Sequence, residues 1–190
     1  MAKSDQADRP PARIEDAPPE ADGSNSGNCV IDVASRDDIP ALLTLQKANL
    51  AGNGGALSVE FSAEWFERSM REMPIIVAKR DGTLVGYLVS SSRNATRHLA
   101  LGEAKYRAYP ASPDAYNSGP LCVSATERGR GLALRLFQAM RTRLAGREAV
   151  SFIRRDNASS RALHRKLDFR EVAEFTLGEI DYIVAAHRDA

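Results

Sequence analysis

The sequence predicts an α/β fold, with helices packed on a central sheet in a single domain, and three observations predict it. Hydrophobic residues make up 43% and charged residues 27% of the 190-residue chain, a composition typical of a globular domain and not of a disordered or fibrous protein. Along the chain, some segments have apolar residues at every second position, as in strands. These segments are interspersed with others in which apolar residues recur at helical spacing. Asp81-Gly82 stands between two apolar runs, which is a strong signal for a β-hairpin.

The cysteines and the hydropathy pattern restrict the environment in which we expect the protein to act. Cys29 and Cys122 are the only cysteines, and they are far apart in the sequence. Such usage fits a reducing compartment and argues against a disulfide framework or a zinc site. No apolar run approaches the ~18 residues that a membrane span needs, and the first thirty residues lack the apolar core of a signal peptide. We therefore expect a cytoplasmic protein with no membrane partner and no metal.

Positive charge is concentrated in one block of the chain. The formal net charge is +1, but residues 1–127 carry −4, residues 128–170 carry +9 and residues 171–190 carry −4. Eleven of the twelve basic residues in the middle block are arginine, whose planar guanidinium matches the oxygens of a phosphate. The block therefore favours an anionic ligand, and a solvated, arginine-rich helix face is the alternative.

Order is predicted to begin near residue 28. Residues 1–27 contain four prolines, many charges and almost no large apolar side chain, so we expect a disordered tail. Residues 28–35 alternate as a strand does, and residues 36–50 follow with helical spacing. A second helix is expected over residues 62–72, with Ser62 as its N-cap.

The rest of the chain alternates strands and helices around one long connection. Residues 92–117 form that connection, within which a short helix is possible over 99–109, while Pro110, Pro113 and Asn117 are predicted to lie in a loop. The other expected elements are strands over 75–79, 83–91, 119–125, 149–153, 171–177 and 180–187, and helices over 132–144 and 158–167.

A glycine-containing loop between a strand and a helix is the most informative segment. In residues 121–133, LCVSATERGRGLA, a predicted strand runs into a loop that opens a helix, and such a loop presents unpaired backbone N–H groups at the positive end of the helix dipole. Gly129 and Gly131 let the backbone approach an anion, and Arg128 and Arg130 add positive charge. The loop lacks the Gly-Lys-Ser/Thr ending of a nucleotide-triphosphate loop and the third glycine of a dinucleotide loop. The loop therefore predicts an anion site. The alternative is that it only makes the turn and caps the helix.

A second segment, residues 157–169 (NASSRALHRKLDF), lies one strand after the loop. On a helix, Ser160, Leu163, His164 and Leu167 share one inward face. An imidazole on that face is either a satisfied core histidine or a proton donor or hydrogen-bond partner aimed at a ligand.

The two segments together resemble a known family. Residues 128–133 (RGRGLA) are similar to the Arg/Gln-x-x-Gly-x-Gly/Ala loop of the GNAT superfamily of acyl-CoA-dependent N-acetyltransferases. Residues 157–169 are similar to the motif that follows in that family, Asn-x-x-Ala-x-x-x-Tyr-x-x-x-Gly-Phe, with matching spacing from Asn157 to Phe169. The resemblance covers about residues 28–187. It implies a mixed, mostly antiparallel central sheet of about six to seven strands flanked by about four helices, in a single N-acetyltransferase domain over residues 28–190.

The resemblance also implies the cosubstrate and its contacts. Acetyl-CoA would donate an acetyl group to a primary amine, which attacks directly in a ternary complex. The pantetheine arm would pair with the backbone of the strand, the pyrophosphate would lie on the loop, and the far side of the thioester would meet the second segment. The residues expected in these three places are Leu121, Cys122 and Val123, then Arg128, Gly129, Arg130, Gly131, Leu132 and Ala133, and finally Asn157 and Ser160.

Some positions depart from the family pattern. His164 stands where the family usually has the tyrosine that protonates the departing thiolate, and the neighbouring Arg161, Arg165 and Lys166 disfavour the imidazolium form that an acid would need. Asp168 replaces the usual glycine, and Ser160 replaces the usual alanine. No position identifies a general base; the candidates by location are Glu103, Glu127 and Asp156, and Glu127 is equally well explained as a solvated loop charge.

The acceptor side of the site is predicted only from the long connection. Tyr106, Tyr109 and Tyr116 lie in it, and they could cover the acceptor cleft, form a homodimer contact or pack the loop onto its own body. Two other functions compete with acetyl transfer. One is a non-catalytic acyl-CoA binder or sensor, and the other, less favoured, is a nucleic-acid-binding module that uses the arginine-rich block 128–170.

Overall fold

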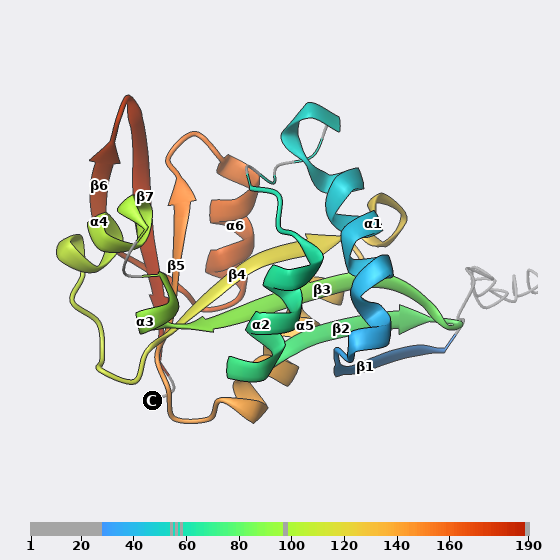
Figure 1. The fold of residues 1–190 in the computed structure, drawn as a ribbon. Helices are drawn as coiled ribbons and strands as arrows, with labels where there is room; N and C mark the ends of the chain where they lie inside the picture. The colour runs from blue at the N-terminus through green and yellow to red at the C-terminus, as the bar shows by residue number, and fades with distance from the viewer. Residues whose placement is uncertain (1–27, 54, 56, 58, 97–98, 189–190) are drawn as a thin grey trace, which may run out of the picture.

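The computed structural model describes residues 28–53, 55, 57, 59–96 and 99–188, and this part of the chain forms one seven-stranded sheet (Figure 1). The predicted tail over residues 1–27 lies outside the described residues. The strands are β1 (Cys29–Val33), β2 (Ile75–Arg80), β3 (Thr83–Ser92), β4 (Tyr116–Val123), β5 (Ala149–Arg154), β6 (Arg170–Leu177) and β7 (Ile180–His187). The helices are α1 (Ile39–Asn49), α2 (Ala63–Glu72), α3 (Arg93–Thr96), α4 (Ala100–Ala108), α5 (Leu132–Arg143) and α6 (Ala158–Lys166), with single 3-10 turns at Arg36–Asp38, Ala51–Asn53 and Ala125–Glu127.

The sheet is mixed and mostly antiparallel, as predicted. Its strand order is β1-β2-β3-β4-β5-β7-β6, and the neighbouring strands are antiparallel except for β4 and β5. The parallel ladder between β4 and β5 contains only two pairs, Tyr116 with Ala149 and Asn117 with Val150. The two strands therefore diverge after a short contact, which opens the middle of the sheet.

Helices cover both faces of the sheet. In Figure 1, α1 and α2 lie on one face of the β1–β4 half and α5 lies on the other. The α5 side buries a core around Leu136, Phe137 and Met140, and the α1–α2 side buries one around Leu42 and Phe66. Helix α5 approaches β3 closely because Gly86 has no side chain: an added Cβ would lie 3.2 Å from side-chain atoms of both Leu132 and Leu136. Close packing of α5 fixes the position of the loop that precedes it.

Local sequence signals explain several element boundaries. Helix α2 begins after Ser62, whose Oγ accepts a hydrogen bond from the backbone N–H of Trp65 at 3.2 Å. The β2–β3 hairpin turns at Asp81 and Gly82, which have φ angles of 49° and 80°, a left-handed region that Gly and Asp tolerate. Both signals were predicted from the sequence, and both are confirmed.

The connection between β3 and β4 differs from the expectation in two ways. Strand β4 begins at Tyr116 and ends at Val123, whereas the sequence predicts a strand over 119–125 and places Asn117 in a loop. Pairing with both β3 and β5 holds this polar segment in extended form, because tertiary contacts override a weak local preference. The same connection carries α3 and α4, so the described residues form six helices where about four were expected; the possible helix over 99–109 is α4.

Helix α4 lies against the half of the sheet that contains β6 and β7 (Figure 1).

Among the described residues, no helix is both long and apolar enough to cross a membrane.

Candidate active site

The site begins where β4 separates from β5. The hydroxyl of Ser151 on β5 donates to the carbonyl of Ser118 on β4 at 2.6 Å, one residue beyond the last ladder pair of the two strands. From Leu121 to Val123, β4 is paired with β3 on one edge, and its register with β5 has ended at Asn117. A strand edge of this kind offers backbone donors and acceptors to an extended ligand.

The direction of these backbone groups follows from the pairing with β3. The N–H of Ser124 donates to the carbonyl of Val85 at 2.8 Å, so it points toward β3. Because backbone N–H groups alternate in direction along a strand, Cys122 points the same way, whereas Leu121 and Val123 point toward the open edge. Leu121 and Val123 are therefore the residues of β4 whose backbone can pair with a ligand between the strands.

The chain leaves β4 directly into the glycine loop. Gly129 and Gly131 have φ angles of 77° and 75°, a left-handed conformation that glycine adopts without strain. Gly131 is the N-cap of α5, and no side chain caps this helix end. The first-turn N–H groups, which have no partner within the helix, are therefore left to meet an anion at the positive end of the α5 dipole.

Two polar contacts hold the loop. Glu127 is 4% exposed and accepts two hydrogen bonds from Arg80 on β2, both at 2.8 Å. These hydrogen bonds hold the pKa of the Glu127 carboxyl below its ordinary value. The Arg128 guanidinium donates to Asn49 Oδ1 at 2.9 Å, which ties the loop to the end of α1. Arg130 is exposed, and its Nη1 lies 3.8 Å from Glu127 Oε1, beyond hydrogen-bond distance, so its guanidinium is held less tightly than that of Arg128 and can turn toward a phosphate.

A known protein family matches the part of the chain that contains this loop and strand. The model described as "Acetyltransferase (GNAT) family" matches residues 42–169, more than half of the chain. The chain belongs to the GNAT acetyltransferase family. A comparison with curated protein sequences gives no match.

Solved structures share the GNAT fold with this chain. A putative acetyltransferase, yncA, from Salmonella typhimurium, determined with its cofactor acetyl-CoA, is 19% identical, with a TM-score of 0.61 over 85% of this chain and 94% of that one. The ribosomal-protein-S18-alanine N-acetyltransferase from Escherichia coli is 16% identical, with a TM-score of 0.60 over 85% and 94% of the two chains. A GNAT-family acetyltransferase from Streptococcus agalactiae is 15% identical, with a TM-score of 0.67 over 85% and 96%. At these low sequence identities, the similarity shows a shared fold only.

The second motif of the GNAT resemblance lies at the start of α6. Asn157 is the N-cap, and its Oδ1 accepts from the Ser160 backbone N–H and from the Ser159 hydroxyl, both at 3.0 Å. The role that the structure shows for Asn157 is thus helix capping, which leaves its Nδ2 amide for another partner. Ser160 is half-buried, one turn before His164.

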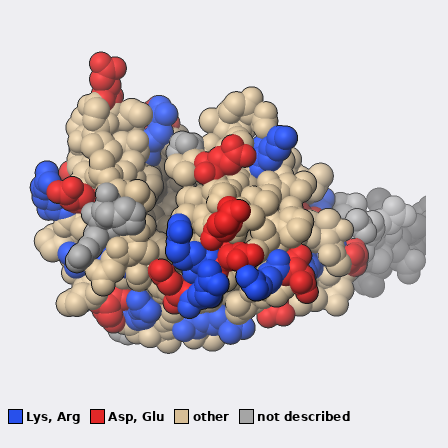
Figure 2. All heavy atoms as spheres, viewed as in Figure 1, with Lys and Arg blue, Asp and Glu red and all other residues tan. Residues whose placement is uncertain are grey.

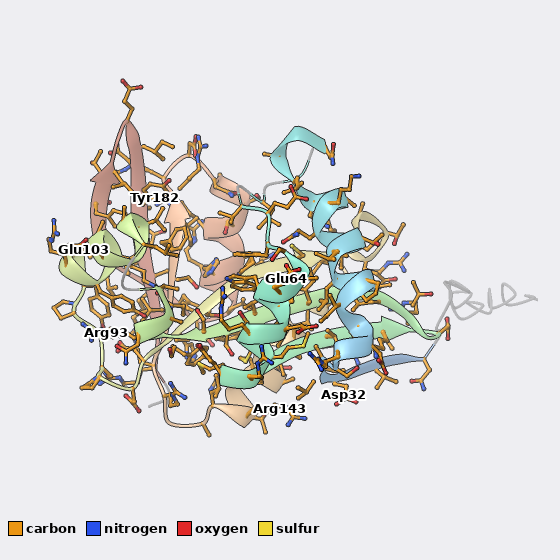
Figure 3. All side chains as sticks on the ribbon, in the orientation of Figure 1. Asp32, Glu64, Arg93, Glu103, Arg143 and Tyr182 are labelled. Atoms are coloured by element: carbon orange, nitrogen blue, oxygen red, sulfur yellow. The ribbon has the colours of Figure 1, made fainter. Side chains whose placement is uncertain are left out.

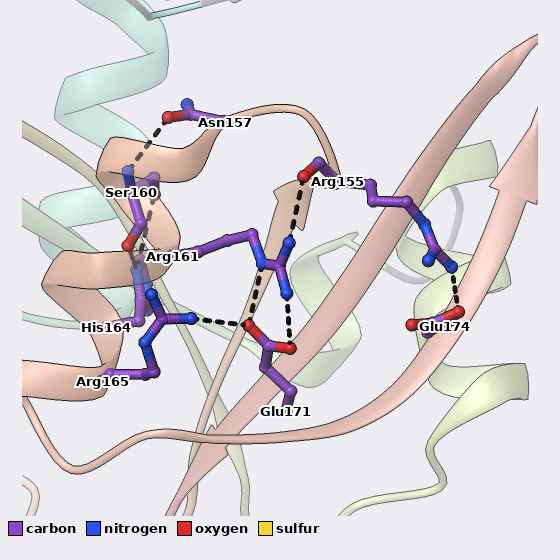
Figure 4. A network of polar contacts seen from close by, with 8 residues as sticks. All are labelled: Arg155, Asn157, Ser160, Arg161, His164, Arg165, Glu171 and Glu174. Atoms are coloured by element: carbon purple, nitrogen blue, oxygen red, sulfur yellow. Dashed lines mark hydrogen bonds and ion pairs between the residues drawn. The ribbon is translucent and has the colours of Figure 1, made fainter.

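His164 is half-buried on α6, and its tautomer is set by a carbonyl. Nδ1 lies 2.8 Å from the carbonyl oxygen of Ser160, which can only accept, so Nδ1 carries a proton and Nε2 of the neutral ring is an acceptor (Figure 4). The ring packs edge-on against Phe169 at 4.9 Å between centroids. Burial lowers the pKa of His164 below its ordinary value, with a smaller opposing effect from the Ser160 carbonyl. Burial, more than the neighbouring cations, disfavours the imidazolium that an acid would need.

The three tyrosines expected on the acceptor side have partners inside the protein. Tyr116 is 1% exposed and belongs to the core on the α5 side, so its ring has no surface to offer an acceptor. Tyr109 donates its hydroxyl to Glu148 at 2.7 Å, and Tyr106, 8% exposed, donates to Asn117 at 2.8 Å. The sequence pattern could not show these partners, because each comes from another element of the fold.

The carboxylates considered as bases by location all have cationic partners. Glu103 lies toward the outer side of α4 and pairs with Arg107 at 2.6 Å (Figure 3). Asp156 pairs with Arg154 at 2.6 Å on the surface, and the buried Glu127 holds Arg80 as described above. The interpretation of Glu127 as a solvated loop charge is wrong, because the turn at Ala125–Glu127 directs its side chain inward onto Arg80.

Much of the positive charge of residues 128–170 is balanced within the fold. Figure 4 shows Arg161 in a two-pronged pair with Glu171 at 2.9 and 3.0 Å, joined by Arg165, while Arg155 pairs with Glu174. These acidic partners come from β6, which the charge count assigned to a separate, negative block. The sequence could not show this pairing, because it depends on the fold bringing β6 close to α6 and to the segment that follows β5.

A hollow on the molecular surface lies in front of the diverging strands. Figure 2 shows the surface hollowed between the lobe that carries β6, β7 and α4 and the lobe that carries α1 and α2. Phe152 on β5 is 41% exposed, and its ring meets the Tyr182 ring edge-on at 5.9 Å between centroids. Lys105 on α4, which was not among the predicted site residues, is buried, and its position next to Tyr106 indicates the inward face of that helix.

Proposed function

We propose that the protein is an N-acetyltransferase that transfers the acetyl group of acetyl-CoA to a primary amine, by direct attack of the amine in a ternary complex. The observation that carries the proposal is the continuous path from the open edge of β4 into the uncapped N-terminus of α5. An extended amide-containing arm that ends in a pyrophosphate matches this path in both hydrogen-bonding pattern and charge.

The cosubstrate would be held chiefly by backbone groups. Leu121 and Val123 would pair with the pantetheine arm, Cys122 would hold the strand to β3, and residues 128–133 would receive the pyrophosphate. A backbone N–H on the open edge of β4 would stabilise the oxyanion that develops when the amine attacks the thioester carbonyl. Asn157 and Ser160 would line the opposite side, and catalysis would rest largely on positioning the two reactants.

The thiolate that departs needs a proton, and His164 remains the candidate donor. Since the neutral ring has its proton on Nδ1 and its lone pair on Nε2, His164 would donate from Nε2 only after it is protonated. The acceptor would enter from the hollow in front of the sheet. A homodimer contact through the connection 92–117 remains a prediction, as does a cytoplasmic location, where Cys29 and Cys122 stay as free thiols.

The first test is calorimetric titration of the protein with acetyl-CoA at two salt concentrations. The proposal predicts saturable binding of one acetyl-CoA, which Gly131→Asp abolishes because a carboxylate then occupies the anion site. An amine panel follows, assayed by release of free CoA thiol. The panel contains an alanine-initiated peptide, because similar structures include ribosomal-protein-alanine N-acetyltransferases, together with a polyamine, free lysine and an aminoglycoside.

The competing functions give different results in the same experiments. A non-catalytic acyl-CoA sensor binds acetyl-CoA but releases no thiol with any amine. A nucleic-acid-binding module binds duplex or single-stranded probes with an affinity that falls steeply with salt. The ion pairs of Arg154, Arg155 and Arg161 favour the enzyme over that module, since they leave fewer free guanidinium groups for phosphates.

A further inference from the structure

Lys105 is the buried amine nearest to the point where β4 and β5 separate. It is 1% exposed and extends from α4 to Asn117, to whose Oδ1 its Nζ donates a hydrogen bond. Asn117 is the last residue of β4 that pairs with β5, opposite Val150. The Lys105 amine is therefore fixed at the closed end of the opening in which we place the acetyl group.

Asn117 holds this amine in place and is itself fully engaged. Its Oδ1 accepts from Lys105 and from the Tyr106 hydroxyl, the latter at 2.8 Å. Its Nδ2 donates to the Ser92 carbonyl at 2.9 Å and to Thr96 Oγ1 at 3.0 Å. Strand β3, α3 and α4 thus fix one side chain, and that side chain fixes the position of Nζ.

Burial without a carboxylate partner opposes a positive charge on Lys105, whereas the aromatic rings beside Nζ favour one. Among the described residues, no carboxylate lies within ion-pair distance of Nζ, and Asn117 is its hydrogen-bond acceptor. The Tyr106 ring lies 4.3 Å from Nζ, and the Arg93 guanidinium lies 4.7 Å from the same ring, so a second cation stands nearby (Figure 3). Burial, and to a smaller extent Arg93, lowers the pKa of Lys105 to about 7, while burial raises that of Tyr106 to about 12.

On one side, the amine lies near an aromatic ring that is partly exposed on the surface. Nζ lies 5.9 Å from the centroid of Phe152, the β5 side chain that is 41% exposed. Among the described residues, the groups around Nζ are the neutral Asn117, Tyr106 and Phe152 and the cation Arg93, and Glu148 is a carboxylate that acts on Tyr106. Phe152 is thus a partly exposed side chain beside Nζ, and a proton path from the surface to the amine would pass this ring.

We propose that Lys105, in its neutral form, is the general base that removes a proton from the acceptor amine. This inference rests on the proposed function, for which a base is required because an ammonium group cannot attack a carbonyl. It also accounts for a lysine buried without a carboxylate, which a purely structural position would not require.

The step balances without a further reactant. The Lys105 lone pair takes one proton from the ammonium R–NH3+, which becomes R–NH2, and Lys105 becomes an ammonium. The C–N bond to the acetyl carbon forms, the C–S bond breaks, and the remaining excess proton of the nitrogen leaves with the thiolate as CoA–SH. Lys105 then returns its proton to solvent, so one proton is released per acetyl group transferred.

The test combines kinetics with a direct titration of the amine. The kinetic arm measures kcat between pH 5.5 and 9 on the best acceptor of the amine panel, for the wild type, Lys105→Met and Asn117→Asp. Lys47→Met is the matched control, because Lys47 is an exposed lysine on α1. The second arm follows lysine Nζ resonances by NMR in 15N-lysine-labelled wild-type protein saturated with acetyl-CoA, which does not depend on any variant folding.

The proposal predicts a wild-type kcat that rises with pH around a midpoint near 7, the value at which burial places the Lys105 pKa. Lys105→Met lowers kcat at pH 7 by about 100-fold, the usual contribution of a general base, and leaves the acetyl-CoA Kd unchanged. Asn117→Asp moves the midpoint to higher pH, because a carboxylate stabilises the ammonium. Lys47→Met retains the wild-type kcat and profile.

Several results would overturn the proposal. The first is a Lys105→Met enzyme with wild-type kcat and pH dependence. The second is a wild-type kcat that falls above pH 7, as expected if a charged Lys105 bound an anionic acceptor. The third is a Lys105 Nζ resonance that titrates near the ordinary pKa of lysine. These results leave acetyl transfer itself intact. A wild-type protein that binds acetyl-CoA but acetylates no amine instead refutes the proposed function, and this inference with it.

Discussion

Replacing Gly131 by alanine separates the ligand-binding role of the glycine loop from its conformational role. Gly131 has a φ of 75°, and a Cβ added there would meet nothing within 4 Å. Gly146, in the turn between α5 and β5, has a φ of 76° and is equally open. Gly131→Ala and Gly146→Ala therefore carry the same backbone cost, about 1 kcal/mol of unfolding free energy for a left-handed alanine.

The two variants should differ only toward acetyl-CoA. A methyl group at Gly131 stands where the pyrophosphate must approach the α5 N-terminus, and we expect about a 10-fold weaker Kd, or about 1.4 kcal/mol. At an acetyl-CoA concentration 100 times the wild-type Kd, the ligand adds about 2.7 kcal/mol to the stability of the wild type and of Gly146→Ala. For Gly131→Ala the same concentration is about 10 times its own Kd and adds about 1.4 kcal/mol.

Urea unfolding with and without acetyl-CoA, beside calorimetric titration, measures both quantities. The reasoning is refuted if Gly131→Ala binds acetyl-CoA as tightly as the wild type does. It is equally refuted if the two variants lose affinity to the same extent, since the loss would then follow from the shared backbone change and not from the loop.

Three further predictions concern stability. Ser62→Ala removes the cap on the Trp65 N–H and should lower the unfolding free energy by about 1 kcal/mol, measured in urea; an unchanged midpoint would contradict the capping role. Phe66→Ala empties a fully buried site in the α1–α2 core and should cost about 3–5 kcal/mol, whereas a loss below about 1 kcal/mol would show that this core is loosely packed. Burial lowers the pKa of His164 in the folded protein, so the unfolded chain binds the proton more readily and the unfolding free energy should fall as the pH drops below the ordinary histidine pKa. His164→Gln should flatten this decline, measured by thermal unfolding between pH 7 and 5. An unchanged slope would exclude His164 as its source.

The order of the elements and the glycine loop could be predicted because they depend on local pattern. Hydrophobic period, the Ser62 cap and the Asp81-Gly82 turn each act within a few residues, and the structure confirms them. The start of β4 could not be predicted in the same way. Asn117 follows a proline-containing stretch and favours a loop locally, yet pairing with both β3 and β5 holds it in the sheet.

The side-chain partners of the site depend on tertiary structure, so the sequence did not contain a visible signal for most of them. Glu127 meets Arg80, and Arg161 meets Glu171, only because separate strands and helices pack together. The environment of Lys105 is of the same kind, since its acceptor comes from β4 and its aromatic cover from α4 and β5. The helical position of Lys105 was visible in the sequence, but the absence of a carboxylate beside it in the described structure was not.

The most direct test of the central claim is amide hydrogen exchange by NMR, with and without acetyl-CoA. The N–H groups of Leu121 and Val123 point to the open edge of β4, whereas that of Cys122 points toward β3. If acetyl-CoA binds along this edge, exchange at Leu121, Val123 and the first turn of α5 slows by a larger factor than exchange at Cys122. Saturable binding that slows all three strand amides equally, or that protects another part of the chain, would contradict the proposed site.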